Sequence, residues 1–505
     1  MSAAVVEDVK VVNGGGHVQS MKAAAAANAT WNDWPFAVLF LAHVGAIVAV
    51  VVTLGIPILS STANDTSTNS IEKTLAGSDM RTILAVAGAL AVIATLVAFL
   101  LLQFVVAYAS RLIRWSLLLA VYLNVGFAVF AAVAGLIWMT IVFAICSGLA
   151  LCYLRLVRNR IPFAAANLQV AAAAVKHNMS TFPLAFGLMA VQIVWFFLWT
   201  IALLGIIKSV TPVIPNPSGL STGSTCKVNS DCQSDMCRKI SKKSSVLTCQ
   251  PLVSAGEVLG YFFMLVSFFW GVNVIKNVLH TTVAGTVASW WMAGDPRKAT
   301  AGAFRRATTT SFGSICLGSL LVAILQAMET VANEAKSRGD WVACVAECFL
   351  KCLRGIMEWI NRWAFVYVGI YGFKFFHAGK SVFTLFSTRG LSAVVNDDLI
   401  GHCMGFMALS NGLICALLGL AYTCVDKEHT AFPGGTVIFP IIGLAVGIGV
   451  ALIPLSVIDS AVATVFVCFA EDPAAFAQTH PELYTNMVAA WRIAHPDAML
   501  AFLPV

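Results

Sequence analysis

The sequence predicts an all-α polytopic membrane protein with about ten transmembrane helices and both termini in the cytosol. Hydrophobic residues make up 59% of the 505 residues and charged residues only 11%. A soluble domain is roughly half apolar and about a quarter charged, so polar surface could not cover this much apolar side chain in water. The apolar residues also form repeated runs of the ~20 residues that a helix needs to cross a bilayer. The formal net charge of +7 is scattered among loops, so it does not indicate a nucleic-acid-binding surface.

Residues 1–34 come before the first apolar run. They are polar and Ala-rich, with a low-complexity run at Ala23–Ala27. They lack the charged region, short apolar core and cleavage site of a secretory signal peptide. We therefore expect a disordered cytosolic tail, and the first span serves as an uncleaved insertion signal.

Residues 35–207 predict the first five spans and residues 256–470 the other five. The run Trp115–Leu154 is too long for one span and predicts two helices joined by a tight turn near Gly135. The remaining single-span runs are Pro35–Leu59, Ile83–Tyr108, Phe182–Ile207, Val258–Leu279, Phe312–Met328, Trp359–Phe376 and Cys403–Cys424.

The last apolar block, Thr436–Phe469, is too long for one straight span and too short for two. Pro440 and Pro454 interrupt it, so it predicts one tilted or broken helix. A broken helix at membrane depth is tolerated where it lines a cavity inside the protein. A proline kink without a functional role is the alternative.

Basic residues set the predicted orientation, because they collect in connectors on the cytosolic side. The connectors after the second, fourth and sixth spans are basic, including 280–311. That places the tails 1–34 and 471–505 in the cytosol and the loop 208–255 outside the cell. The basic segment 336–357 falls on the outer side against this rule, so its side stays open.

The outer loop contains Cys226, Cys232, Cys237 and Cys249 among polar residues. Four cysteines in a segment too short to bury a core predict two disulfides, with three possible pairings. A zinc site is the alternative. Asn64 lies in an Asn-Asp-Thr sequon of the first outer loop and is a predicted N-glycosylation site.

No sequence motif indicates an enzyme, a cofactor or a bound metal. A single acid, Asp459, stands out inside the last apolar block. A charged side chain is costly within a bilayer, so Asp459 is a candidate to neutralise a cationic substrate. The alternative is a structural ion pair with a base on another helix, such as Lys374 or Lys276.

Aromatic and amide side chains at helical spacing form a second set of substrate-binding candidates. Trp195 and Trp199 share one face of the fifth span, and Trp270 and Asn273 share one face of the sixth. Tyr371 lies in the eighth span. Aromatic faces attract quaternary ammonium ions, although such stripes on membrane helices also serve as interfacial belts or plain packing.

Several stretches, taken in order along the chain, form a recognisable set: Asp33–Phe40, Asp295–Arg297, Ala307–Leu321, Cys344–Cys352, Trp359–Ala364, Gly372-Phe373 and Val465–Asp472. The set resembles the choline transporter-like family, most closely its branch in fungi, plants and protists. The resemblance implies a ten-helix solute carrier that moves choline, or ethanolamine, for phospholipid synthesis. It also places Asp459 at an acidic position of the family. The disulfide-bearing loop departs from animal members, in which it follows the first span.

The function we expect is that of a passive or proton-exchanging carrier that moves choline by alternating access, with the substrate held near mid-membrane by aromatic faces and Asp459. The expected partners are a small cationic substrate and the lipid bilayer, in the plasma membrane or an internal membrane. No cofactor, metal or nucleic acid is expected. The alternatives are transport of another organic cation, or a non-transporting membrane scaffold or lipid-handling protein.

Overall fold

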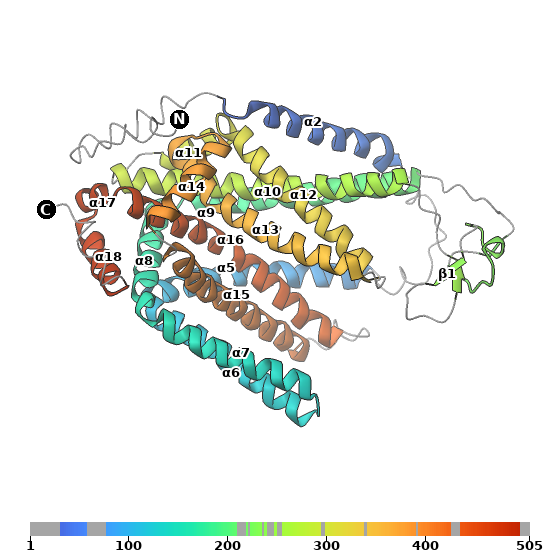
Figure 1. The fold of residues 1–505 in the computed structure, drawn as a ribbon, viewed down its shortest axis with the longest axis horizontal. Coiled ribbons are helices and arrows are strands. Elements are labelled where there is room, and N and C mark those ends of the chain that lie inside the picture. The colour runs from blue at the N-terminus through green and yellow to red at the C-terminus, as the bar shows by residue number, and fades with distance from the viewer. Residues whose placement is uncertain are drawn as a thin grey trace.

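The computed structural model describes residues 31–57, 77–209, 219–220, 223–234, 237–239, 247–249, 255–293, 298–337, 341–389, 392–425 and 435–494. Most of the expected N-terminal tail and the predicted glycosylation site at Asn64 lie outside these residues. Figure 1 shows long helices that run side by side. They are α2 (Trp34–Val50) with its π-helical extension η1 (Val51–Gly55), α5 (Gly77–Ala107), α6 (Ala109–Val133), α7 (Ile137–Val157), α9 (Thr181–Ser209), α10 (Ala255–Ala293), α12 (Phe312–Ser337), α13 (Trp341–Tyr371), α15 (Ser392–Val425) and α16 (Gly435–Glu471).

Nine helices of the described residues are long and apolar enough to cross a membrane. α13 is not among them, because it carries charged residues from Glu347 to Arg362. It is nevertheless 31 residues long and packs against α10 and α12 within the bundle. These ten long helices confirm the predicted fold class.

The outer surface of the bundle is apolar. Leu100, Val133 and Trp138 are 71%, 85% and 83% exposed. Exposure of so many large apolar side chains to water would be unfavourable. Contact with lipid tails removes this cost.

Small residues let α15 and α16, the described helices with the most extensive mutual contact, approach closely. A Cβ atom added to Gly419 would lie 2.4 Å from the carbonyl oxygen of Phe439, and one added to Gly443 would lie 2.3 Å from that of Cys415. Without a side chain at these positions the two backbones can touch, which is how membrane helices gain packing energy in the absence of a hydrophobic driving force.

The two ends of the bundle differ. Short helices gather at one end, together with the start of α2 (Figure 1). The disulfide-bonded strands lie at the opposite end, as the predicted topology requires. The short helices are α8 (Ile161–His177), α11 (Ala299–Thr308), α14 (Phe375–Arg389), α17 (Pro473–Thr479) and α18 (Pro481–Ala494).

Hydrogen bonds fix the start of α2 to this end of the bundle. The Asn32 side-chain amide donates to the Gly372 carbonyl oxygen at 2.6 Å. The Asp33 carboxylate accepts from the Ser314 hydroxyl at 2.6 Å and from the Phe375 amide at 2.9 Å. The beginnings of α2, α12 and α14 and the end of α13 are therefore joined through two adjacent side chains.

Several predicted helix limits need correction. α10 continues to Ala293, so a large part of the predicted connector 280–311 belongs to this helix, and α11 fills most of the rest. α13 ends where Gly372 adopts a φ of +69°, a common helix stop, so the predicted span Trp359–Phe376 is shifted along the chain. α16 is one continuous helix despite Pro440 and Pro454.

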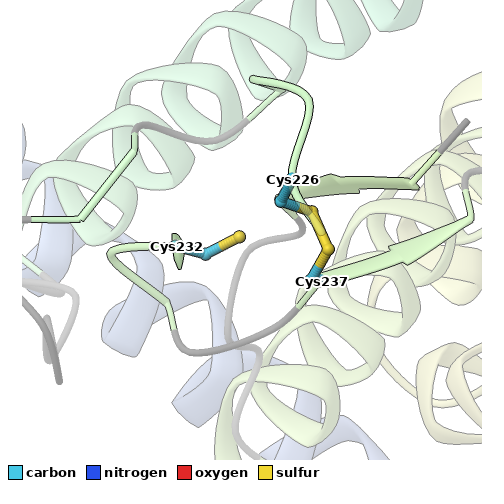
Figure 2. Close-up of side chains that lie close together, drawn as sticks. All are labelled: Cys226, Cys232 and Cys237. Carbon is cyan, nitrogen blue, oxygen red and sulfur yellow. A yellow bond between two sulfur atoms is a disulfide. The ribbon is translucent and has the colours of Figure 1, made fainter. Parts of the chain in front are cut away.

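The cysteine-rich loop is held by two disulfides, Cys226–Cys237 and Cys232–Cys249. Strands β1 (Cys237–Lys239) and β2 (Leu247–Cys249) pair antiparallel between them. Figure 2 shows Cys226, Cys232 and Cys237 gathered together, with ligand atoms within 4.8 Å of one another as in a metal site. Because all four sulfurs are bonded in pairs, no thiolate is left for zinc, and the disulfide prediction is confirmed.

Candidate functional site

An ion pair crosses from α13 to α16 inside the bundle. The Arg362 Nη2 atom donates to Asp459 Oδ1 at 2.8 Å. The Arg362 and Asp459 side chains are 24% and 34% exposed. Asp459 thus pairs with a base on another helix, as the structural alternative expects, but this base is Arg362 and not Lys374 or Lys276.

A histidine on α10 joins this pair and is itself buried. The His280 Nε2 atom lies 2.8 Å from the Arg362 carbonyl oxygen, and Nδ1 lies 2.8 Å from the Ser460 hydroxyl oxygen. Ser460 directly follows Asp459 on α16. We call His280, Arg362, Asp459 and Ser460 the polar centre, where α10, α13 and α16 meet.

An open cavity of about 460 Å³, closer to a surface depression than to an enclosed chamber, lies beside the polar centre. Arg362 forms part of its wall, so the ion pair stands at the cavity's edge. The lining combines apolar side chains of α6 and α15 with two basic groups. The lining residues are Ser116, Leu119, Ala120, Leu123, Arg362, Gly401, His402, Gly405, Phe406 and Leu409.

Two of the predicted aromatic residues enclose a histidine. The His43 ring stacks on Trp270 at 5.1 Å between centroids and meets Trp195 edge-on at 5.6 Å. The indole N–H of Trp195 donates to the Phe268 carbonyl oxygen, and that of Trp270 to the Cys316 carbonyl oxygen. The faces expected to hold a cation thus pack between helices.

Asn273 lies in a chain of polar contacts between α10, α12 and α13. Its amide donates to Gln326 at 2.8 Å, and Gln326 donates to Glu358 at 3.2 Å. Arg354 then contacts Glu358 at 3.0 Å and Glu329 at 2.5 Å. Each of these polar groups has a hydrogen-bond or ion-pair partner, because an unpaired polar group is costly in the low dielectric inside a membrane bundle. The sequence marked only Asn273 of this set and did not predict the chain of contacts.

The remaining two candidates also lie apart from the polar centre. The Trp199 indole donates to the Met264 carbonyl oxygen at 3.0 Å. Tyr371 stacks on Tyr367 and Phe373 near the end of α13. Of the six predicted substrate residues, only Asp459 reaches the polar centre.

Sequence reasoning missed Arg362, His280 and His402 as site residues. Arg362 lies inside the stretch Trp359–Ala364 that carries the family resemblance, and it is a charged residue in a membrane helix. That signal alone could have marked it. Its pairing with Asp459 could not be read, because 97 positions separate the two.

Comparison with known proteins identifies the family. Residues 141–474 match the family model described as plasma-membrane choline transporter. The matched segment makes up more than half of the chain and includes His280, Arg362 and Asp459. The chain belongs to the choline transporter-like family. It is therefore a multi-pass member of a family of membrane transporters.

Relatives of this choline transporter-like protein occur in an amoeba and in fungi. It is 28% identical over 387 residues to a CTL-like protein of Dictyostelium discoideum, covering 75% of this chain and 61% of that protein. It is 36% identical over 248 residues to protein PNS1 of Gibberella zeae, covering 47% and 46%. Protein PNS1 of Yarrowia lipolytica is 29% identical over 417 residues, covering 78% and 68%. The chain thus spans less than two thirds of the first two relatives' own length.

Proposed function

We propose that this protein transports choline across the plasma membrane by alternating access, with Asp459 as the anionic group that attracts the substrate. The observation that carries the proposal is the family match, which includes the Arg362–Asp459 pair. Charged side chains inside a membrane bundle are costly in free energy, so an ion pair there indicates a functional site. This pair also borders a cavity large enough for a small organic molecule.

Choline suits the chemistry of this cavity. Its positive charge sits on a quaternary nitrogen that cannot donate a hydrogen bond, so it is recognised by a negative charge and by aromatic or apolar walls. The lining itself contains no carboxylate, so the charge would come from Asp459, which pairs with Arg362 at the cavity's edge. Phe406 with its apolar neighbours on α6 and α15 supplies the wall. This assignment moves the aromatic contact from the predicted tryptophans to Phe406.

Arg362 gives the proposed cycle a switch. In the structure its guanidinium neutralises Asp459, so a cation that binds Asp459 has to displace Arg362 from the carboxylate. Substrate binding would then separate Arg362 from Asp459, and release on the other side would let the pair re-form. A contact that is exchanged in this way changes the relative free energies of two conformations, as alternating access requires.

Purified protein in proteoliposomes tests the proposal with labelled choline. We expect saturable uptake that protein-free liposomes lack and that Phe406→Ala weakens. Competition with unlabelled ethanolamine and with other organic cations ranks the substrates, and stronger competition by another cation would replace choline as the substrate. Folded protein that gives no saturable uptake of any of these cations would refute transport and favour the scaffold alternative.

A further inference from the structure

We propose that His280 is a proton-binding site, and that the Ser460 hydroxyl lets its ring gain or lose a proton without any heavy atom moving. The coupling to substrate rests on the proposed function, whereas the proton site itself does not.

One nitrogen of His280 must always carry a hydrogen. Nε2 lies 2.8 Å from the Arg362 carbonyl oxygen, and a carbonyl oxygen only accepts hydrogen bonds. Nε2 is therefore an N–H donor. In the neutral ring the other nitrogen, Nδ1, then has no hydrogen and accepts one from the Ser460 hydroxyl, 2.8 Å away.

Ser460 has a second place for its hydroxyl hydrogen. Its Oγ atom also lies 2.8 Å from the Ser456 carbonyl oxygen. When the hydrogen turns toward Ser456, the oxygen lone pairs face His280 Nδ1 and accept a hydrogen bond from a protonated ring. Both protonation states of His280 are thus fully hydrogen-bonded in one arrangement of heavy atoms.

His43 shows that this arrangement is not general for histidines of the bundle. Its Nε2 atom lies 2.7 Å from the Ser267 hydroxyl oxygen. Its Nδ1 atom is buried and has no hydrogen-bond partner among the described residues. Protonation of His43 would add an N–H without an acceptor, which is unfavourable in a buried site. His43 is therefore the matched control.

The charges that face His280 tie its proton to the polar centre. Burial of the ring is the largest influence and opposes a positive charge on it, and the Arg362 carbonyl oxygen and Asp459 on α16 favour the proton, whereas the charges of Arg362 on α13 and Lys276 on α10 repel it. A cation bound at Asp459 adds a positive charge to the polar centre, in which Arg362 stays attached to His280 through its carbonyl oxygen, so the proton should leave as the substrate binds. By linkage, the proton must weaken cation binding by the same factor. The exchange needs no reactant other than a proton from water.

The first experiment needs no substrate. Nitrogen-15 NMR of labelled histidines in the purified full-length protein, with the His280 signal identified by its loss in His280→Gln, follows ring protonation between about pH 4 and about pH 8. We expect His280 to titrate, and Asp459→Asn to lower its midpoint by about one pH unit or more. Ser460→Ala should lower the midpoint too, because the charged ring loses its acceptor. A ring that stays in one protonation state throughout would overturn the proposal.

The second experiment measures the affinity for choline across the same pH range. We expect the wild type to bind more weakly as the pH falls below the His280 midpoint, by up to about tenfold per unit. His280→Gln should remove this dependence, and His43→Gln should keep it. If His280→Gln does not fold, Ser460→Ala takes its place and should shift the dependence to lower pH.

The two experiments separate the two proposals. Titration of His280 in a protein that neither binds nor transports choline would refute the proposed substrate and support the proton site. Choline transport with the same pH profile in wild type and His280→Gln would support the substrate and overturn the coupling of this proton to it.

Discussion

Replacing Asp459 with asparagine is the most direct perturbation of the polar centre, because it removes the charge and keeps the side-chain shape. Breaking a fully buried ion pair costs about 3–5 kcal/mol, and an exposed pair contributes about 0–1 kcal/mol. With side chains 24% and 34% exposed, this pair lies between those limits. We expect Asp459→Asn to lower the free energy of unfolding by about 1–3 kcal/mol.

Asp459→Asn should also weaken choline transport, because the bound cation loses an attractive charge. Two unit charges about 4 Å apart attract by about 4 kcal/mol at an effective dielectric constant of 20. Allowing for the exposure of Asp459, about 2 kcal/mol remains for a bound cation. That corresponds to a loss of about 30-fold in kcat/KM for choline uptake. The assay is initial uptake into proteoliposomes, with the amount of folded protein measured by size-exclusion chromatography.

A double mutant separates a structural role from a substrate-binding role. Arg362→Gln with Asp459→Asn removes both charges, so no unbalanced charge remains and stability should recover. If Asp459 binds substrate, uptake stays about 30-fold low in the double mutant. Recovered uptake, or unchanged kinetics in Asp459→Asn alone, would refute the reasoning. Glu358→Gln is the matched control, since that carboxylate also pairs with an arginine, at 3.0 Å, but this arginine, Arg354, does not line the cavity as Arg362 does. Its uptake should stay within about threefold.

Three further changes test other parts of the structure. Trp270→Phe removes the 3.0 Å hydrogen bond to the Cys316 carbonyl oxygen and should lower the free energy of unfolding by about 1–2 kcal/mol. Its KM for choline should stay unchanged, and a raised KM would indicate that Trp270 contacts the substrate. Asp33→Ala removes two hydrogen bonds that join α2 to α12 and α14. It should lower the free energy of unfolding, measured by chemical denaturation, by about 2–3 kcal/mol, and Asp33→Asn should lower it less. Two variants as stable as the wild type would contradict this role. Burial lowers the pKa of His480, whose ring lies 4.0 Å from that of Trp290. Because the folded-state pKa is below the ordinary value, packing of α17 against α10 should be complete above about pH 6.5 and weaken as the pH falls below it. Tryptophan fluorescence measures this, and His480→Phe should remove the pH dependence.

The sequence predicted the fold well because hydrophobicity along the chain is a local property. It also marked Asp459, since one acid in an apolar run stands out without any knowledge of its neighbours. Its partners could not be read, because Arg362 and His280 come from helices far away in the chain and the sequence does not say which faces meet. The tryptophan prediction had the same weakness. Helical spacing places Trp195 and Trp270 on definite faces, but only the packing of α2 shows that His43 lies between them.

The charges on α13 explain both why this helix is the least apolar member of the bundle and what it is attached to. Arg354 is bound by two carboxylates, one from α12 and one from α13 itself, and α13 packs along far more of α12 than of α16. Arg362 has its carboxylate on α16 instead, in a single contact beside a cavity. Separating α13 from α12 would expose Arg354 and its carboxylates to a medium that solvates them poorly. Separating α13 from α16 breaks one ion pair, which a cation at Asp459 can replace, and the hydrogen bond that the Tyr367 hydroxyl donates to Glu471 at 2.6 Å. The distribution of charge therefore favours α12 and α13 moving together and places the contact that substrate would exchange between α13 and α16.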